Sequence, residues 1–531
     1  MATTTTSSAA ARVPVPVWAG LGVLAVGLGV SLALLTGFGQ AMACGTFGLD
    51  CIAAAFGMVL CTLCAALVLL LRGLGTLRRS GGFSVAKVLT VGIAGIVALA
   101  MVLLRGREGH GALAGRCACP PCCAGDARPG PGHDTMPAPH PRIAMLNFDF
   151  HNPTRIAFGQ GRIADLDKLV PAAAKVLILV GGASAEKTGT LAEVRTALAS
   201  RQHATFSGIE PNPSYETSMK AVAQIREGGF DFLLAVGGGS VIDAVKFIAA
   251  AVKFEGGDPW AILEKHGRNV TAALPFGAVL TLPATGSEMN NGGVITHRAK
   301  GAKLAFGSHH TYPVFSVLDP TKTYTLPPQQ LANGVVDAFV HTVEQYLTYP
   351  VNAPVQDRFA EGILQTLIEI GPRLLTAPEP VYDDRANLMW AATMALNGLI
   401  GAGVPQDWAT HMIGHELTAL HGIDHARTLA IVLPALLHER RGPKRAKLLQ
   451  YGERVWGITT GTDDERITAA IGRTRAFFES MGIATRLSGY GLGADTVGAV
   501  VAQLEAHGMV TLGEQREITP AVSRRILEAA L

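Results

Sequence analysis

The sequence predicts an α/β domain followed by an all-α domain, with a membrane extension of three helices in front of them. Three observations support this fold class. Long apolar runs are confined to the first hundred or so residues, strand and helix patterns alternate in the middle of the chain, and long helical patterns fill the C-terminal part. The length of 531 residues is typical of two to four domains.

The composition separates the first quarter of the chain from the rest. The net charge is only +3 and charged residues make up 16% of the chain, so no basic surface is indicated and we expect no nucleic-acid partner. All eight cysteines lie before residue 124. The cysteine-free remainder is typical of an enzyme of the reducing cytoplasm.

Three apolar runs, at about 15–35, 51–71 and 88–104, make up the N-terminal extension 1–105. Each is close to the ~20 residues that a helix needs to cross ~30 Å of hydrocarbon. A signal peptide or a buried core helix could explain one run, but three in succession favour transmembrane helices. We therefore expect membrane contact through residues 15–104, and a linker rich in Pro, Gly and Cys over residues 106–144.

The cysteines of residues 1–123 leave a second interpretation open for this region. Cys61-x-x-Cys64 lies inside the second apolar run, and Cys117-x-Cys119-x-x-Cys122-Cys123 follows the third. Because thiolates bind soft metals, residues 1–123 could form a membrane metal-transport or metal-delivery module. The plainer interpretation is that these are small hydrophobic cysteines of membrane helices beside a chance cluster.

From residue 145 the pattern changes to short apolar strands that alternate with helices. The expected helices cover Ser214–Glu227 and Val241–Val252. The expected strands are Lys175–Val180, Ala204–Ile209, Phe232–Val236, Gly277–Leu282 and Val314–Leu318. Apolar strands joined by helices predict a doubly wound parallel sheet, so we expect residues 145–324 to form a Rossmann-like cofactor-binding domain.

A glycine-rich turn stands between one of these strands and the next helix. Gly237-Gly-Gly-Ser240 would let the backbone approach a phosphate, which the free N–H groups of the helix N-terminus favour. The run differs from G-x-G-x-x-G and from a P-loop, so a tight structural turn is the alternative. Asp243, in the first turns of the helix, could bind a ligand hydroxyl or be an ordinary N-terminal carboxylate.

Residues 325–531 are expected to form a helical domain that binds a metal. Its clearest helical patterns are Asn333–Leu347 and Val355–Leu375. Asp337 and His341 are four residues apart on one helix face, which is a spacing found for metal ligands but also for ordinary surface pairs.

Four histidines within fifteen residues, His411, His415, His421 and His425, strengthen the metal interpretation. In one straight helix His411 and His425 would lie ~21 Å apart, which is too far for two ligands at ~2 Å from one ion. They can share a metal only if the chain turns back, and Gly422 offers a place to turn. His411 and His415 would need no turn, so the residues alone leave both pairs open.

Four motifs carry a resemblance that covers essentially all of residues 145–531. Gly237–Lys246 reads GGGSVIDAVK, Thr281–Glu288 reads TLPATGSE, Leu318–Pro320 reads LDP and Gly334–His341 reads GVVDAFVH. Together with the histidine cluster, these runs resemble the iron-containing alcohol dehydrogenase family, whose fold is dehydroquinate synthase-like. Within that family, the sequence is similar to bacterial NADPH-dependent aldehyde reductases of broad specificity and to butanol dehydrogenases.

The resemblance implies a reaction and its site residues. The expected reaction is the reversible NADPH-dependent reduction of small aldehydes to alcohols, with one divalent metal, Zn(II) or Fe(II), polarising the carbonyl. The implied metal ligands are Asp337, His341, His411 and His425. His415 is a candidate proton relay, and His421 is a structural or surface residue. The implied cofactor-binding residues are Gly182, Ser184, Gly238, Gly239, Ser240, Asp243, Thr281, Thr285, Asn290 and Lys303.

The turn Gly182–Ser184 contains no acidic residue that would bind a ribose hydroxyl and repel a 2′-phosphate, so we expect a preference for NADPH. Glycerol or polyol dehydrogenases and dehydroquinate synthases, which have the same fold, are the rival interpretations. We also expect a homodimer. The arginines around the apolar runs indicate conflicting topologies, but the enzyme must meet NADPH. The catalytic part is therefore expected in the cytoplasm, tethered to the membrane where the extension is present.

Overall fold

The structure is a computed structural model that describes residues 143–531, all of them within one compact unit. The predicted membrane helices at 15–35, 51–71 and 88–104, the linker up to residue 142 and all eight cysteines lie outside the described residues. Within residues 143–531, no helix is both long and apolar enough to span a membrane. The extension, with its alternative of a metal-delivery module, stays a prediction.

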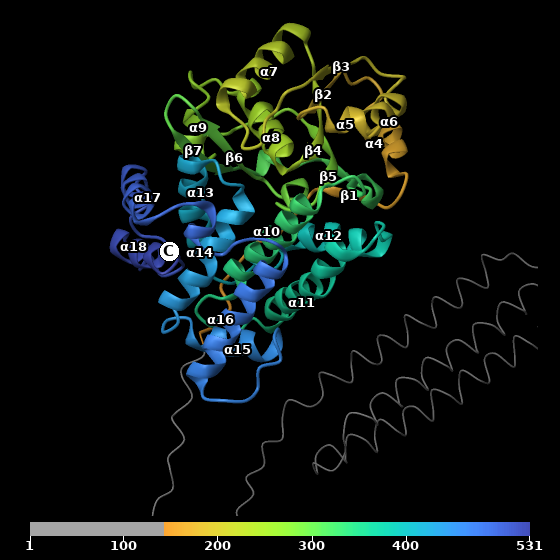
Figure 1. Cartoon of the computed structure of the whole chain (residues 1–531). Coiled ribbons are helices and arrows are strands. Elements are labelled where there is room, and N and C mark those ends of the chain that lie inside the picture. The colour runs from red at the N-terminus through yellow and green to blue at the C-terminus, as the bar shows by residue number, and fades with distance from the viewer. Residues whose placement is uncertain (1–142) are drawn as a thin grey trace, which may run out of the picture. The chain divides into compact units, whose positions relative to one another are not determined.

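A six-stranded parallel sheet lies in the first part of the described chain (Figure 1). Its strands follow the order β1-β8-β5-β4-β2-β3, and every neighbouring pair is parallel. The bounds are Arg155–Phe158 (β1), Val176–Val180 (β2), His203–Phe206 (β3), Phe232–Gly238 (β4), Phe276–Leu282 (β5) and Phe315–Leu318 (β8). The predicted α/β architecture with a parallel sheet is confirmed.

Both faces of the sheet are buried, which explains its continuous apolar strands. In β2, Leu177 and Leu179 face a core that contains the residues of α8, whereas Val176, Ile178 and Val180 face a second core. The helices of this part are Leu166–Leu169 (α4), Ser184–Lys187 (α5), Thr190–Ala197 (α6), Tyr215–Gly228 (α7), Gly239–Lys253 (α8) and Ala261–Glu264 (α9).

An antiparallel hairpin, β6 (Gly292–His297) with β7 (Ala302–Gly307), forms a separate two-stranded sheet. It packs against α8, and α13 of the helical part contacts β7. The sequence pattern did not predict it, because β6 begins with two glycines and both strands are only partly buried. The hairpin matters for function because it faces the cavity described below.

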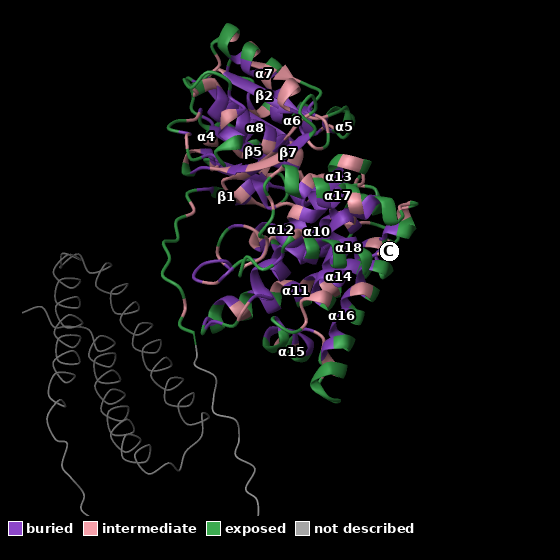
Figure 2. Cartoon of the chain, turned by 90° about the vertical axis from the view of Figure 1, so that its left-hand side faces the viewer, coloured by how far each residue is buried: buried purple, intermediate pink, exposed green. Residues whose placement is uncertain are grey.

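The second part of the described chain is helical, as predicted. Pro328 begins α10, where its missing N–H costs no helix hydrogen bond. Most residues of α10 and α14 are buried, and Figure 2 shows both in the core of this part. The helices are Pro328–Tyr346 (α10), Pro354–Thr376 (α11), Tyr382–Ala395 (α12), Ala409–His421 (α13), His425–Glu439 (α14), Arg445–Arg454 (α15), Asp463–Ser480 (α16), Ala494–Ala506 (α17) and Pro520–Glu528 (α18).

The chain reverses between α13 and α14. Gly422 follows the last residue of α13 with φ 69°, and its N–H donates to the Thr418 carbonyl. This left-handed conformation ends the helix and is readily adopted by glycine. His425 then begins α14, which packs against α13. The turn that the histidine spacing required is therefore present at the predicted glycine.

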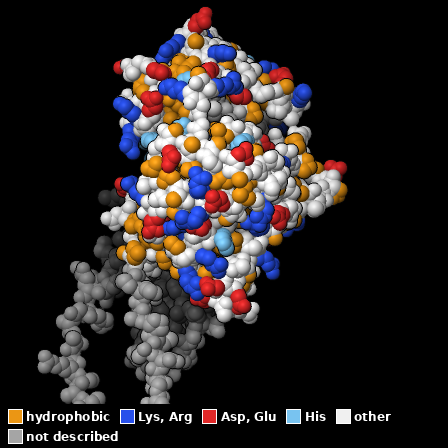
Figure 3. Space-filling view, turned by 60° about the vertical axis from the view of Figure 1, so that its left-hand side comes forward, with side chains coloured by type: hydrophobic (Ala, Val, Ile, Leu, Met, Phe, Trp, Pro, Cys, Tyr) orange, Lys and Arg blue, Asp and Glu red, His pale blue; other side chains and the backbone are white. Residues whose placement is uncertain are grey.

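On the surface of the described part, acidic and basic side chains are interspersed. Figure 3 shows this on one face, where lysine, arginine, aspartate and glutamate alternate among apolar and neutral groups.

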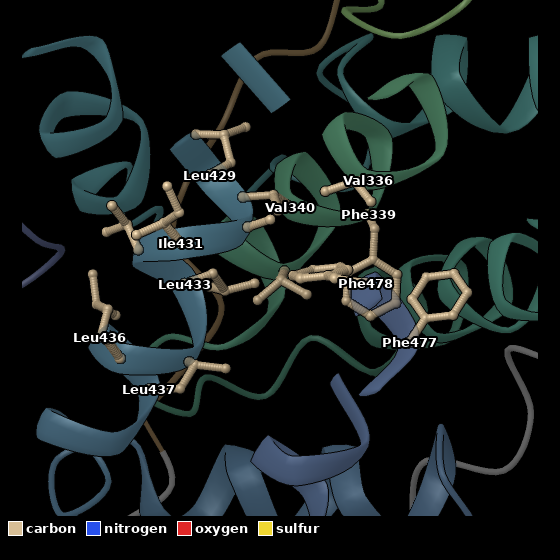
Figure 4. Packing of buried hydrophobic residues seen from close by; sticks show 14 of the residues in the cluster. Val336, Phe339, Val340, Leu429, Ile431, Leu433, Leu436, Leu437, Phe477 and Phe478 are labelled. Carbon is tan, nitrogen blue, oxygen red and sulfur yellow. The ribbon is translucent and has the colours of Figure 1, made fainter. Parts of the chain in front are cut away.

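The core of the helical part predicts which phenylalanines matter for stability. Phe339 on α10 is fully buried, and its ring lies 5.4 Å from those of Phe477 and Phe478 (Figure 4). Phe339→Ala should reduce the free energy of unfolding by about 3–5 kcal/mol, because it leaves a cavity. Phe359→Ala on α11, where the residue is 48% exposed, should change it by less than about 0.5 kcal/mol. Denaturant titration of both variants measures this, and equal losses would contradict the core assignment.

Candidate active site

A cavity of about 500 Å³ lies where the α/β part meets the helical part. Its walls come from the N-terminus of α8, the hairpin β6–β7, and helices α10, α13 and α14. Ten of the residues predicted from the sequence line it. They are Gly239, Ser240, Asp243, Thr285, Asn290 and Lys303 on one side, and His341, His411, His415 and His425 on the other. The cavity therefore joins the glycine-rich turn to the histidine cluster.

At the glycine-rich turn no loop separates the strand from the helix, because β4 ends at Gly238 and α8 begins at Gly239. The glycines are required by close packing. A Cβ on Gly237 would come within 2.5 Å of Val241 Cγ2, and one on Gly239 would collide with the Thr285 side chain. The first turn of α8 has free N–H groups and no acidic residue. An anion is favoured at such a helix N-terminus.

Four of the predicted cofactor residues do not line this cavity: Gly182, Ser184, Gly238 and Thr281. Gly182 and Ser184 are exposed just beyond β2, whereas Gly238 and Thr281 lie near the ends of β4 and β5. Strands β2, β4 and β5 are neighbours in the parallel sheet, so these residues share its carboxyl edge. Ligands of such sheets commonly bind at that edge.

Lys246, the last residue of the GGGSVIDAVK motif, does not line the cavity but bonds to residues that do. Its fully buried Nζ donates to Ser287 Oγ, Asn290 Oδ1 and the Gly292 carbonyl, at 2.8, 2.7 and 2.6 Å. Burial lowers the pKa of Lys246 to about 8, against the attraction of Asp243 and Glu288. Since its three donors are satisfied inside the protein, Lys246 fixes the start of the hairpin and is not free to bind a phosphate.

Asp243 also lines the cavity and connects α8 to the hairpin. One of its carboxylate oxygens accepts from Ser287 Oγ at 2.5 Å and the other from the N–H of Val294 at 3.0 Å, so it ties α8 to β6. Lys303 on β7 donates to Asn212 Oδ1 at 2.8 Å. Burial lowers the pKa of Lys303 to about 8, although Asp243, Asp337 and Glu416 oppose this. Among the described residues, Lys303 is the only lysine or arginine that lines the cavity.

The structure brings Asp337, His341, His411 and His425 together at one point. From Asp337 Oδ1, the Nε2 atoms of His341, His411 and His425 lie at 3.7, 4.0 and 3.8 Å. The metal-ligating atoms of Asp337, His341 and His411 all lie within 4.8 Å of one another. Such separations leave room for one ion at about 2 Å from each atom.

The chemistry of these donors fits a divalent cation. Asp337 Oδ1 and His411 Nε2 are buried and have no hydrogen-bond partner among the described residues. Burial lowers the pKa of His341 and His425 well below the ordinary value, so their imidazoles are neutral, as metal ligation requires. Burial also raises the pKa of Asp337 to about 6, with His411 and Lys303 opposing. Unpaired buried polar atoms are costly, and a cation would satisfy them.

Glu344, which sequence analysis missed, supports this cluster from α10. The fully buried carboxylate accepts a hydrogen bond from His411 Nδ1 and another from the N–H of Thr410, the latter at 2.6 Å. The first bond leaves His411 Nε2 facing Asp337. The spacing of Asp337, His341 and Glu344, at positions i, i+4 and i+7 of one helix face, was the signal that could have found it.

Two further aromatic side chains surround the cluster. The buried ring of His415 lies 5.1 Å from that of His425 and 6.2 Å from that of His411. The ring of Trp408, just before α13, lies 5.3 Å from His411 and 6.1 Å from His341. His421, in contrast, is exposed at the end of α13 and does not line the cavity.

Comparison with known proteins defines the family. Residues 153–320 match the iron-containing alcohol dehydrogenase family, and residues 331–531 match the C-terminal region of the same family. The chain therefore belongs to the iron-containing alcohol dehydrogenases, which confirms the resemblance seen in its motifs. It is an oxidoreductase of the alcohol dehydrogenase and aldehyde reductase class.

Individual relatives are similar over their whole length. The NADPH-dependent aldehyde reductase YqhD of Escherichia coli is 64% identical over 387 residues, which are 73% of this chain and 100% of that protein. The probable NADH-dependent butanol dehydrogenase 1 of Bacillus subtilis is 39% identical over 73% of this chain and 100% of its own.

Solved structures agree with this similarity. The crystal structure of E. coli YqhD matches with a TM-score of 0.73 and 62% identity, over 73% of this chain and 100% of that one. The NADH-dependent butanol dehydrogenase A of Thermotoga maritima matches with a TM-score of 0.70 and 33% identity, over 73% and 99% of the two chains.

Replacing Glu344 tests its contact with the candidate metal centre. Glu344→Gln removes the negative charge that holds His411, so the affinity for a divalent metal should fall by roughly 10- to 100-fold. Competition with a chromophoric chelator measures that affinity. Glu361→Gln is the matched control, because Glu361 is also buried but bonds to Tyr346 and arginines instead. An unchanged affinity in Glu344→Gln would refute this role.

Proposed function

We propose that residues 145–531 catalyse the reversible NADPH-dependent reduction of aldehydes to alcohols. The observation that carries this proposal is the single cavity that joins the N-terminus of α8 to the cluster of Asp337 and three histidines. Support also comes from the 64% identity to a protein named as an NADPH-dependent aldehyde reductase, over the whole of that protein.

In this proposal Asp337, His341, His411 and His425 hold one divalent metal ion. When bound, the ion polarises the carbonyl oxygen of the substrate and stabilises the negative charge that develops there. Three imidazoles and one carboxylate suit Zn(II) and Fe(II) alike, so the donor set allows either metal.

The other side chains bind the cofactor and place it. The N–H groups at the start of α8, with Gly238, Gly239 and Ser240, bind the pyrophosphate, and Asp243, Thr281, Thr285 and Asn290 shape the cofactor site. Lys303 adds positive charge, and Gly182 and Ser184 leave room for the 2′-phosphate. The hairpin, fixed by Lys246, lines the cavity and would limit the access of water to a nicotinamide ring bound there.

His415 supplies the proton that the product alcohol needs. It lines the cavity 5.1 Å from the ring of His425, and burial lowers its pKa well below the ordinary value. A neutral imidazole has one donor and one acceptor nitrogen, so His415 gives the N–H proton of one ring nitrogen to the developing alkoxide and takes a proton from solvent water at the other nitrogen.

The direct test is a survey of substrates with full-length protein of measured metal content. NADPH consumption is followed with butanal and other short aldehydes, and NADP⁺ reduction with alcohols and glycerol. We expect butanal to be reduced far faster than glycerol is oxidised. The opposite order would favour a glycerol or polyol dehydrogenase.

Single replacements test two of the four proposed metal ligands, with His415 for comparison. His411→Ala and His425→Ala should each lose most of the bound metal and lower the reduction rate by about a hundredfold or more, because the charge on the carbonyl oxygen loses its counter-ion. His415→Ala should keep the metal and lose only rate. Metal analysis and steady-state kinetics check all three. Full metal and full rate in either ligand variant would show that the ligand set is wrong.

Gly182 tests the preference for NADPH. It is exposed, and a Cβ added there would meet nothing within 4 Å, so Gly182→Asp should fold normally. The new carboxylate should lower kcat/KM for NADPH by at least about tenfold through repulsion of the 2′-phosphate, with little effect on NADH. Equal kcat/KM values for NADH and NADPH in the unmodified enzyme would contradict the preference itself.

Lys303 predicts a pH dependence of cofactor binding. With a pKa of about 8 it is charged below that pH and neutral above it. The kcat/KM for NADPH should therefore be level below about pH 8 and fall above it, because the attraction to the cofactor's phosphates disappears. Lys303→Met should show roughly tenfold lower values and no such fall, whereas Lys303→Arg should stay level to higher pH. A fall near pH 8 that persists in Lys303→Met would assign it to another group.

The remaining predictions concern assembly and location. We expect a homodimer, which analytical ultracentrifugation tests. We also expect the catalytic part to work in the cytoplasm, where NADPH is, with the apolar runs within 15–104 as a membrane tether. Carbonate-resistant sedimentation of the full-length chain with membranes supports the tether, and recovery in the soluble fraction contradicts it.

A further inference from the structure

The end of the cavity beyond the histidine cluster is walled by the loop before α13 and the first turn of that helix. The lining residues there are Leu396, Asn397, Gly398, Gln406, Trp408 and Met412. We infer that Trp408, the bulkiest of them, is a specificity-determining residue: its indole lies beside the place of the acyl group and sets how bulky an aldehyde is accepted. This inference rests on the proposed function, because it concerns the substrate of that reaction.

The backbone of Trp408 is in a conformation that is unfavourable for an aromatic residue. Its φ is 61° and its ψ is 4°, in the left-handed region that residues other than glycine and asparagine rarely adopt. Conformations of this kind persist only where the surrounding structure enforces them, and they cluster at ligand sites.

Buried hydrogen bonds on both sides of Trp408 enforce it. The N–H of Asp407 donates to the Glu344 carbonyl at 2.9 Å, and Asp407 Oδ1 accepts from the N–H of Ala409 at 3.1 Å. Asp407 Oδ2 lies 2.8 Å from Lys444 Nζ, and both side chains are almost fully buried. The residue before Trp408 is thereby fixed to the helical core, and this holds the backbone from which the indole projects.

The indole is directed at the place where chemistry is proposed to occur. Its ring lies edge-on to His411 at 5.3 Å and to His341 at 6.1 Å. Its Nε1–H donates to Gln406 Oε1 at 2.8 Å, so the only polar atom of the ring is already satisfied. A carbonyl oxygen held at the histidine cluster places the carbon chain of the substrate within reach of this ring.

The neighbouring polar groups give no reason to expect a charged substrate. Gln345 Nε2 donates to two backbone carbonyls at 2.8 Å each, and Gln406 Nε2 donates to a third at 3.3 Å. Lys303, the one basic side chain that lines the cavity in the described part of the chain, comes from β7 on the cofactor side. The chamber thus fits a neutral aldehyde.

The volume of the cavity limits how large the substrate can be. Its volume of about 500 Å³ must hold the nicotinamide end of the cofactor as well as the substrate. Binding cavities for whole small ligands measure roughly 300–1,000 Å³. Trp408 is the bulkiest of the lining residues at this end, so its size sets how much of that volume the acyl group can use.

Selectivity between aldehydes of different bulk tests this role. We compare kcat/KM for propanal, 2,2-dimethylpropanal and benzaldehyde, with saturating NADPH and full-length protein of measured metal content. Trp408→Ala should raise the ratio of either bulky aldehyde to propanal by about tenfold or more, and Trp408→Phe should raise it less. Trp390→Ala, which removes a 42% exposed tryptophan on α12, should leave the ratio unchanged.

The possible outcomes are distinguishable. An unchanged ratio in Trp408→Ala with normal metal content would overturn the inference and leave the proposed function intact. If Trp408→Ala loses its metal or its fold, the ratio in Trp408→Phe decides by the same criterion, since it keeps an aromatic ring on the same anchored backbone. No NADPH-dependent reduction of any aldehyde by the unmodified enzyme would overturn the proposed function, and this inference with it.

Discussion

The structure depends on gathering one carboxylate and three imidazoles beside one cavity. Asp337 and His341 come from one turn of α10, His411 from α13 and His425 from the first residue of α14. Their Nε2 atoms lie 3.7–4.0 Å from Asp337 Oδ1, and unpaired polar atoms remain among them. Without a cation such a cluster is unfavourable. The packing of α10, α13 and α14 must therefore hold these four side chains together, and a bound metal ion would offset the cost of their unpaired polar atoms.

The cofactor side is built by a different device. There backbone groups form the site, because β4 runs directly into α8 and the glycines at this junction allow close packing. Lys246 and Asp243 both fix the hairpin β6–β7, and Asp243 also lines the cavity. The two parts meet around one cavity, where α13 contacts β7 and α10 contacts β5.

Local patterns predicted much of this arrangement. Apolar strands before glycines predicted the parallel sheet. His411 and His425 could share a metal only if the chain turned back between them, and Gly422 makes that turn with φ 69°. Other features depend on contacts between distant segments, which periodicity does not reveal. Glu344 is visible only once α13 packs on α10, and the strained backbone of Trp408 only once Asp407 meets Lys444. The partly buried hairpin has too weak a pattern to be seen, and the extension lies outside the described residues.

We propose that side chains from α10, α13 and α14 bind one metal ion. X-ray absorption spectroscopy of the metal-loaded full-length protein tests it most directly, because it counts imidazole, carboxylate and sulfur ligands around the ion. The account predicts three imidazoles at about 2.0–2.1 Å, one carboxylate oxygen and no sulfur, with one imidazole fewer in any metal that His425→Ala retains. Sulfur ligands at about 2.3 Å would place the metal on the N-terminal cysteines instead, and an unchanged spectrum in the variant would contradict the shared site.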